Sequence, residues 1–303
     1  MRVLVTGSEG FLAARLIRAL RADPRVTEIR GLDAAHGRDL RDATDVADSC
    51  AGITHVFHLA FVPGGSAERD WPRALETNVA GTANLLAACA RQAQPPVFVF
   101  ASAMAVYGAT PDGIVDDDTP AEGIGAYAAA KRAVEILIAE AARTGRVDGR
   151  SIRLPTTIVR PSRKGPTTAG FISDLIVARA AGRDYVAPLP LDRVFAVAAL
   201  RRSIKALLVS GEAPREAFGP RRAIGLPTIA VTPQDAIDAV ARVFGPRPGG
   251  VSVAFDPAID AAIGAWPRQV RSARAEALGL GASETLEDIV ARYRDDPEEL
   301  QSP

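Results

Sequence analysis

Residues 3–13 read VLVTGSEGFLA and decide how the first half of the chain folds. The run up to Thr6 predicts a short buried strand, and the turn after it carries Gly7 and Gly10 before the small Ala13. Gly7 permits a tight turn, Gly10 lets the backbone approach a diphosphate, and Ala13 allows the next helix to pack closely on the strand. Free N–H groups at the start of that helix favour phosphate. The stretch therefore predicts a strand–turn–helix unit that binds a dinucleotide.

An acidic residue, Asp33, ends the second predicted strand at 28–33. A carboxylate at this place accepts hydrogen bonds from the adenosine ribose and repels a 2′-phosphate, so NAD is favoured over NADP. The competing interpretation is that Asp33 only begins a turn. Asp39 and Leu40, in the loop that follows, are weaker candidates for contact with the adenine edge.

The first half alternates short apolar strands with longer helical segments. Expected strands lie at 2–6, 28–33, 55–59 and 97–101, and expected helices at 11–21, 73–91 and 126–143. This alternation predicts right-handed crossovers and an α/β Rossmann fold with a doubly wound parallel sheet. We expect an NAD-binding domain at 1–160 and, at 161–303, a smaller C-terminal α+β substrate lobe from which some segments return to the first domain.

The second half is less regular in its pattern. We expect a strand at 151–159, a loop at 162–168, a helix at 171–181, a helix that begins at Thr232-Pro233, and a last helix at 283–294 with Ser283 as its cap.

Composition narrows the functional classes. The 303 residues carry 36 basic and 36 acidic side chains, and this zero net charge argues against a nucleic-acid partner. No apolar run is long enough to span a membrane. Cys50 and Cys89 show no motif spacing, so we expect a reducing, cytoplasmic setting. His55 and His58 lie three apart in a strand and face opposite sides, and we expect no metal.

Tyr127 and Lys131 begin the helix expected at 126–143, and their i, i+4 spacing places both side chains on one face. A nearby ammonium favours the phenolate form of tyrosine, so Tyr127 could exchange a proton with a substrate hydroxyl. Taken alone, the same spacing also fits an ordinary amphipathic helix.

Several motifs together resemble the extended short-chain dehydrogenase/reductase family, which includes NAD-dependent epimerases and dehydratases. They are the Gly7/Gly10 turn, Asp33, His58-Leu59-Ala60, Asn78 with Gly81-Thr82, Val106-Tyr107-Gly108, Tyr127/Lys131 and Arg160-Pro161. The resemblance implies that Tyr127 is the acid/base, that Lys131 binds the ribose and lowers the tyrosine pKa, and that Asn78 supports a proton path. It also implies a homodimer formed through the helices at 73–91 and 126–143.

The second half is similar to the D-erythronate dehydrogenase group in Arg153-Leu154-Pro155-Thr156, Gly225-Leu226-Pro227 and Asp256-Pro257. This resemblance implies NAD-dependent oxidation of a small sugar acid at its 2-hydroxyl. Cofactor-binding residues are then expected at Gly7, Glu9, Gly10, Phe11, Leu12, Asp33, Asp39, Leu40, Leu59, Ala60, Asn78, Ala101, Tyr127, Lys131, Leu154 and Thr156. Substrate-binding residues are expected at Gly64, Ala103, Met104, Tyr127 and Arg193. For Arg193 a surface position is an equal alternative, and for Gly64 loop flexibility also explains the glycine.

One departure from the family pattern concerns the catalytic serine. Counting back from Gly108, its position is held by Ala103, and Ser102 lies one place earlier. Adjacent strand residues face opposite sides, so Ser102 can serve as the catalytic hydroxyl only if the strand has ended or bulged there. The leading expectation is an NAD-dependent dehydrogenase. The alternatives are an epimerase, dehydratase or lyase of the same fold, and an NAD-binding sensor or scaffold with little turnover.

Overall fold

The computed structural model describes residues 1–160 and 170–296, and the loop expected at 162–168 lies outside these ranges. Its centre is a six-stranded parallel sheet with the order β10-β6-β4-β3-β1-β2. The strands are β1 (Arg2–Thr6), β2 (Glu28–Leu32), β3 (His55–His58), β4 (Val97–Ala103), β6 (Asp148–Leu154) and β10 (Ala223–Gly225). Since β2 and β3 flank β1, the order reverses there, and ligands bind at the carboxyl end of such a switch point. This topology confirms the predicted doubly wound fold.

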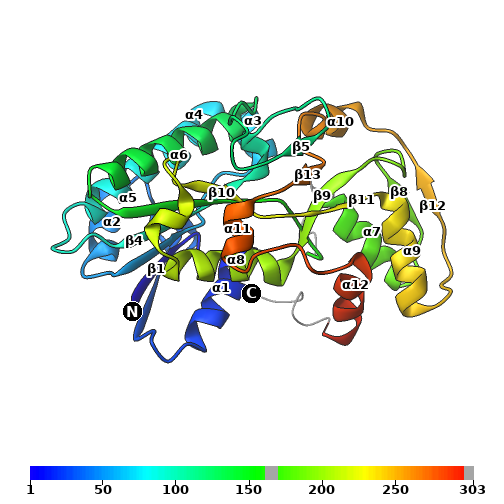
Figure 1. Cartoon of the computed structure of the whole chain (residues 1–303), viewed down its shortest axis with the longest axis horizontal. Coiled ribbons are helices and arrows are strands. Elements are labelled where there is room, and N and C mark those ends of the chain that lie inside the picture. The colour runs from blue at the N-terminus through cyan, green and yellow to red at the C-terminus, as the bar shows by residue number, and fades with distance from the viewer. Residues whose placement is uncertain (161–169, 297–303) are drawn as a thin grey trace.

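Helices cover both faces of the sheet (Figure 1). One face carries α1 (Phe11–Arg21) and α8 (Leu200–Glu212), and the other carries α2 (Ala43–Cys50), α5 (Gly81–Cys89) and α6 (Ala126–Arg143). The alternation of β1 explains the two cores, because Val3 and Val5 belong to one buried cluster and Leu4 to the other.

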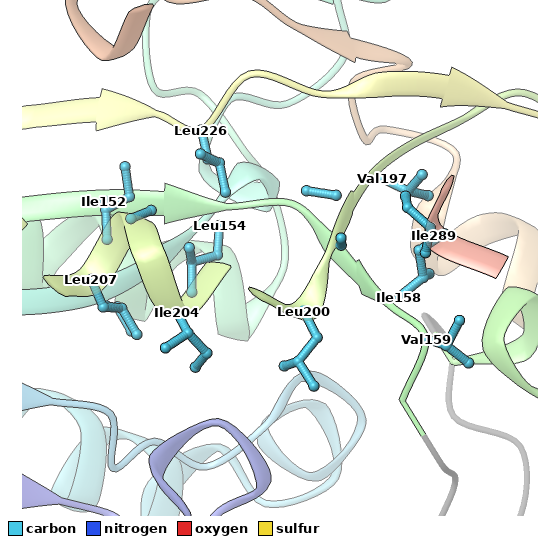
Figure 2. Packing of buried hydrophobic residues seen from close by; sticks show 14 of the residues in the cluster. Ile152, Leu154, Ile158, Val159, Val197, Leu200, Ile204, Leu207, Leu226 and Ile289 are labelled. Atoms are coloured by element: carbon cyan, nitrogen blue, oxygen red, sulfur yellow. The ribbon is translucent and has the colours of Figure 1, made fainter. Parts of the chain in front are cut away.

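The packing of α8 shows how the larger core is built. Leu200, Ile204 and Leu207 from this helix share a buried cluster with Ile152 and Leu154 of β6 (Figure 2). Burying each side chain of this size contributes about 1.5–3 kcal/mol. Strand β10 and helix α8 come from the second half of the sequence, yet both belong to the layers of the main sheet.

The second lobe lies at the far end of the molecule from β1 and β2 (Figure 1). A mixed sheet of three strands has the order β11-β9-β7, and two small pairs join β8 with β12 and β5 with β13. The strands are β5 (Ile114–Val115), β7 (Thr156–Ile158), β8 (Tyr185–Ala187), β9 (Phe195–Ala199), β11 (Ile229–Val231), β12 (Val251–Val253) and β13 (Gln269–Val270). The helices are α7 (Phe171–Ala180), α9 (Pro233–Phe244), α10 (Pro257–Ile263) and α12 (Leu286–Asp295). A further short helix, α11 (Ala273–Ala277), lies near the middle of the molecule and contacts β10 of the main sheet (Figure 1). None of the helices in the described ranges is long and apolar enough to cross a bilayer.

Two predicted elements are broken in the structure. The strand expected at 151–159 splits at Pro155, which has no N–H for a ladder, and the chain passes from β6 to β7 in the other sheet. The helix expected at 73–91 begins at α4 (Trp71–Ala74), widens into a π-helical segment, η2 (Leu75–Ala80), and continues as α5.

The two predicted helix caps have different outcomes. Thr232 caps α9 and accepts the N–H of Asp235, as expected. Ser283 does not cap the last helix. That cap is Thr285, whose hydroxyl accepts the N–H of Asp288, so α12 starts three residues later than predicted.

Candidate active site

The glycine-rich turn lies between β1 and α1, at the carboxyl edge of the sheet. Gly7 has a φ of 66°, and a Cβ there would stand 2.8 Å from the backbone of Ala60, so only glycine fits. The N–H of Gly10 donates to the carbonyl of Gly7 at 2.9 Å, and Gly10 precedes α1 without a side-chain cap. The first amides of α1 therefore remain available to an anion, as the turn predicts.

Asp33 closes one side of this turn. Its Oδ2 accepts the N–H of Glu9 at 3.0 Å, and its Oδ1 accepts the N–H of Ala35 at 2.9 Å. The two bonds fix the carboxylate beside the glycine turn, in the place where a ribose would be recognised. Both oxygens keep acceptor capacity, because a carboxylate oxygen can take a second hydrogen bond.

A cavity of about 540 Å³ opens over the turn. Its lining includes Gly7, Gly10, Asp33, Arg38, Asp39, Leu40, Leu59, Ala60, Phe61, Val62, Ser66 and Arg69. This lining brings together seven of the predicted cofactor residues. The size, the bare glycine backbone and the acidic residue fit a dinucleotide, whose diphosphate would meet the α1 amides and whose ribose would meet Asp33.

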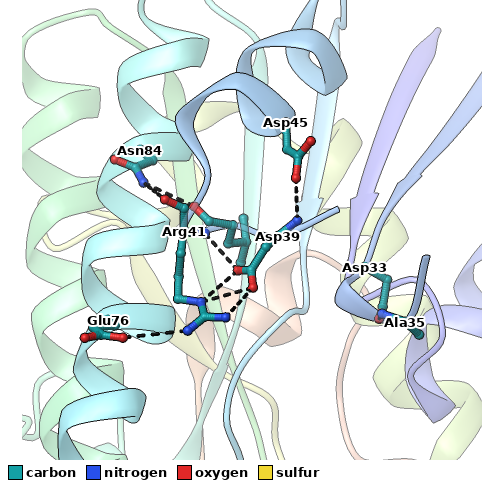
Figure 3. Close-up of polar contacts among 8 residues, drawn as sticks. Asp33, Ala35, Asp39, Arg41, Asp45, Glu76 and Asn84 are labelled. Atoms are coloured by element: carbon teal, nitrogen blue, oxygen red, sulfur yellow. Dashed lines mark hydrogen bonds and ion pairs between the residues drawn. The ribbon is translucent and has the colours of Figure 1, made fainter. Parts of the chain in front are cut away.

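Asp39 differs from Asp33 because a cation already pairs with its carboxylate. Arg41 lies 2.6 Å from Asp39 and 3.7 Å from Glu76 (Figure 3), and this guanidinium lowers the pKa of Asp39. Asn84 donates to the carbonyls of Leu40 and Arg41 at 3.2 and 3.3 Å. The loop at the expected adenine end is thus held mainly by its own ion pair.

Tyr127 and Lys131 lie in the first two turns of α6. The Nζ of Lys131 donates to the carbonyl of Ala101 at 2.6 Å and lies 5.6 Å from the centre of the Tyr127 ring. Burial lowers the pKa of Lys131 to about 7 and raises the pKa of Tyr127 to about 12, and the nearby Arg160 opposes the latter rise. The protein groups alone therefore leave Tyr127 protonated at neutral pH.

Asn78 lies in the π-helical segment η2. Its Oδ1 accepts the N–H of Val62 at 2.7 Å, and its Nδ2 donates to the carbonyl of Val62 at 3.3 Å. The side chain thus fastens the loop that follows β3, and the widened turn of η2 is a feature often found at functional sites. Asn78 therefore lies beside the loop that follows β3, and the part of Asn78 in a proton path stays a prediction.

A buried hydrogen-bond chain connects the same loop to η2 through His58. The Thr82 hydroxyl donates to the Asn78 carbonyl at 2.6 Å, so it must accept from His58 Nε2–H at 2.8 Å. His58 Nδ1 then accepts from the Thr6 hydroxyl at 2.7 Å, and that hydroxyl oxygen accepts the amides of Leu59 and Ala60. Burial lowers the pKa of His58 to about 3, which keeps the ring neutral.

Ser102 is not placed to act as the catalytic hydroxyl, and this prediction is wrong. Strand β4 runs on through Ala103, and the Ser102 hydroxyl donates to Glu135 at 2.6 Å. Glu135 is itself paired with the buried Arg153 at 2.7 Å. Because strand neighbours face opposite sides, Ser102 points away from the side on which Ala103 lies.

The expected substrate residues are only partly brought together. A Cβ on Gly64 would lie 3.8 Å from the Tyr127 ring, so α3 (Gly64–Arg69) begins close to the tyrosine. Met104 does not face an open site, because it is 4% exposed and packs in a small apolar cluster. Arg193 pairs with Asp260 at 3.3 Å, which occupies part of its guanidinium.

Leu154 and Thr156 lie at the end of β6 and the start of β7. Leu154 is the register partner of Ala103. The Thr156 hydroxyl is buried, at 6% exposure of the residue, and has no hydrogen-bond partner among the described residues.

Two residues beside the tyrosine were missed by the sequence reasoning. Phe61 packs against both Tyr127 and Lys131, and Arg160 acts on the pKa of Tyr127. An aromatic residue directly after a buried strand normally indicates core packing, so position alone gave no signal for Phe61. Arg160 belongs to the Arg160-Pro161 motif, and no local sequence pattern indicates that it acts on Tyr127.

The comparisons with known proteins agree with this geometry. Residues 3–191 match the NAD dependent epimerase/dehydratase family, and the chain belongs to this family. The match confirms the predicted class, an enzyme that uses NAD.

Two dehydrogenases are similar to this chain over nearly its whole length. A D-erythronate dehydrogenase of Cupriavidus necator is 31% identical, over 98% of this chain and 98% of its own length. A D-erythronate dehydrogenase of Haemophilus influenzae is 25% identical, over 97% and 98%.

Solved structures show the same fold. A nucleoside-diphosphate-sugar epimerase from Agrobacterium tumefaciens superposes with a TM-score of 0.89 at 25% identity, covering 98% of this chain and 94% of that one. A GalE-like L-threonine dehydrogenase from Cupriavidus necator superposes with a TM-score of 0.88 at 22% identity, covering 98% and 100%.

Proposed function

We propose that the chain is a dehydrogenase that interconverts a hydroxyl and a carbonyl on a small, acidic, sugar-acid-like substrate, with Tyr127 as acid/base. The observation that carries this proposal is the pairing of Tyr127 and Lys131 at the carboxyl end of β4, next to the cavity over the glycine turn. The names of the two erythronate relatives support the substrate class.

NAD⁺ supplies the hydride acceptor when it is bound. The α1 amides would hold its diphosphate, Asp33 would bind the ribose, and Ala101, Leu154 and Thr156 would lie at the nicotinamide end. In oxidation, the Tyr127 phenolate takes the proton of the substrate hydroxyl, and in reduction the Tyr127 hydroxyl returns it. The positive charge of Arg160 opposes the burial that raises the pKa of Tyr127.

Ala103 removes one hydrogen-bond donor from the substrate oxygen. The buried, unpartnered hydroxyl of Thr156 is the available replacement, because its strand follows Leu154, the register partner of Ala103. Losing a preorganised donor without a replacement costs about 10²–10³ in rate. Thr156→Val should therefore lower kcat far more than Thr157→Val, its neighbour on the opposite side of β7.

Titration of the full chain with NAD and NADP, followed by assays of NADH formation on C4 2-hydroxy acids, tests the proposal. We expect NAD to bind more tightly than NADP and at least one acid of erythronate type to be oxidised. Tight NAD binding without oxidation of any member of the panel would refute the dehydrogenase.

The same alanine favours a second candidate, an epimerase, dehydratase or lyase that uses the Tyr127 base differently. For this function we expect substrate to change its stereochemistry or lose water while the NADH concentration stays constant. NMR of the reaction mixture separates it from the dehydrogenase, and an NAD-binding sensor or scaffold would give neither signal.

We also propose a cytoplasmic homodimer formed through η2, α5 and α6. The support is a set of exposed apolar side chains on α4, η2 and α6, namely Trp71, Leu75, Ile136 and Leu137, with Ile136 67% exposed. The two cysteines are free and buried, in keeping with a reducing compartment. Light scattering should give twice the chain mass, and Ile136→Asp should reduce it to that of one chain.

A further inference from the structure

Phe61 lies at the meeting point of the cofactor cavity and the proton-transfer pair. It lies in the loop after β3 and lines the cavity over the glycine turn. The Nζ of Lys131 stands over its ring, 3.7 Å from the ring centre. The Tyr127 ring meets it edge to face, with centres 5.6 Å apart and planes at 87°. One side chain therefore touches both members of the pair.

We propose that Phe61 is a positioning residue that holds the charged Lys131 in place and fixes the ring of Tyr127. This inference rests on the proposed function, in which these two residues transfer and tune the proton. The face of an aromatic ring attracts a cation within about 6 Å of its centre, and the attraction grows when water is excluded. Phe100 lies on another side of the same ammonium, at 4.4 Å.

The surroundings of Lys131 explain why a ring is needed. The residue is 3% exposed, and its hydrogen-bond acceptor among the described residues is the carbonyl of Ala101. An ammonium has three donors, so one bond leaves most of its charge without compensation. The rings of Phe61 and Phe100 supply negative π-density there without adding a titrating group.

The charged and titrating groups around the pair come from several elements. From α6 come Tyr127 itself and Glu135, which raises the pKa of Lys131. From β3 comes His58, kept neutral by burial. Beyond these, α3 contributes Glu68, which accepts the Tyr127 amide, β6 contributes Arg153, paired with Glu135, and the end of β7 contributes Arg160. Glu135 is therefore the anion that acts on Lys131, and it is shared with Arg153 and Ser102.

Removing the ring should make Lys131 lose its proton more easily. At a site without water, the loss of the cation–π contribution corresponds to a drop of about 1.5 in the pKa of Lys131. With less positive charge nearby, the phenolate of Tyr127 is less favoured. The acidic limb of the pH profile for substrate oxidation should then move to higher pH.

The experiment uses the full chain with ¹³C-labelled lysine, because the sequence holds only Lys131, Lys164 and Lys205. The Cε signal of Lys131 is assigned by its loss in Lys131→Met and is then titrated with pH. Phe61→Leu and Phe61→Met remove the ring and keep an apolar side chain, and Phe61→Tyr keeps the ring. A ¹H–¹⁵N spectrum shows which variants are folded.

We expect the pKa of Lys131 to be lower in Phe61→Leu and Phe61→Met than in the wild type, and to be unchanged in Phe61→Tyr. An unchanged titration in a folded variant without the ring would overturn the proposal. This measurement needs no substrate, so it decides the role of Phe61 even if the chain oxidises none of the tested acids. Conversely, suppose that the wild type oxidises a substrate while the pKa of Lys131 is the same in Phe61→Leu as in the wild type. That result refutes the role of Phe61 and supports the dehydrogenase.

Discussion

The cofactor end and the substrate end of the site are built in different ways. At the proposed cofactor end, the main feature is backbone: Gly7 and Gly10 line the cavity without side chains, and two amides fix Asp33. At the proposed substrate end, the candidate groups are side chains. Ala103 has no hydroxyl, Arg193 is paired with Asp260, and the Thr156 hydroxyl has no hydrogen-bond partner among the described residues. A site made of backbone can be recognised from its glycines, whereas a site made of side chains depends on which residues the fold brings together.

Removing the Tyr127 hydroxyl should have the largest effect on kcat. It would show that the reaction occurs between the proposed cofactor end and the substrate end. We expect Tyr127→Phe to lower kcat about 10³-fold, because proton transfer typically contributes 10²–10⁴. The Kd of this variant for NAD should change far less than kcat, because the proposed diphosphate and adenosine contacts remain. Tyr293→Phe, in the second lobe, is the matched control and should keep full activity. Retained turnover in Tyr127→Phe would remove the tyrosine from the mechanism.

The backbone nature of the cofactor end can be broken at one glycine. Gly7→Ala should weaken NAD about 10²-fold, since its Cβ would collide with Ala60 and displace the turn. Gly37 has a similar φ of 71°, but nothing lies within 4 Å of an added Cβ. Gly37→Ala therefore carries the same backbone strain without the collision. Calorimetric titration of both variants with NAD should show a large loss for Gly7→Ala alone, and equal losses would mean that strain is the cause.

The buried lysine should make stability depend on pH. Burial lowers the pKa of Lys131 to about 7, whereas an unfolded lysine has a pKa of about 10.4. Between these values the unfolded chain binds more protons, so the free energy of unfolding rises with pH. We expect the wild type to gain about 2 kcal/mol from pH 7 to 9 relative to Lys131→Met. Urea unfolding at each pH measures this, with the exposed Lys205→Met as control, and a flat difference would show that Lys131 is charged and stable when buried.

The smallest expected change in kcat concerns Ala103, at the proposed substrate end. Ala103→Ser should raise kcat about tenfold if a missing donor limits the rate. Steady-state kinetics on the best substrate would measure the change. A fall in kcat would instead show that the pocket has been rebuilt around the alanine.

The strand, turn and helix at the proposed cofactor end could be predicted because their sequence signals are local. The strand, the turn and α1 come from 20 consecutive residues, Arg2–Arg21, and Asp33 follows at the end of the next strand. The substrate end depends on contacts between distant residues. Arg193 meets Asp260, and Ser102 meets Glu135, and no local pattern shows either pair.

Some predictions were wrong because one sequence pattern fits two different local structures. Helical spacing over 73–91 does not distinguish an α-helix from one that contains a π turn, so η2 was missed. Phe61 has the position of a core aromatic and the contacts of a site residue. The strand expected at 151–159 continued through Pro155 because the residues on both sides are apolar or β-branched.

The Thr6–His58–Thr82 chain has a consequence for communication within the molecule. Each hydroxyl hydrogen and the imidazole hydrogen has a single acceptor, so the polarity of the chain runs one way, from the Leu59 and Ala60 amides to the Asn78 carbonyl. The amides at one end can only donate and the carbonyl at the other can only accept, so the two ends fix this direction and the Nε2–H tautomer of His58. The loop after β3 and the segment η2 are thus joined through buried side chains in a single hydrogen-bond arrangement.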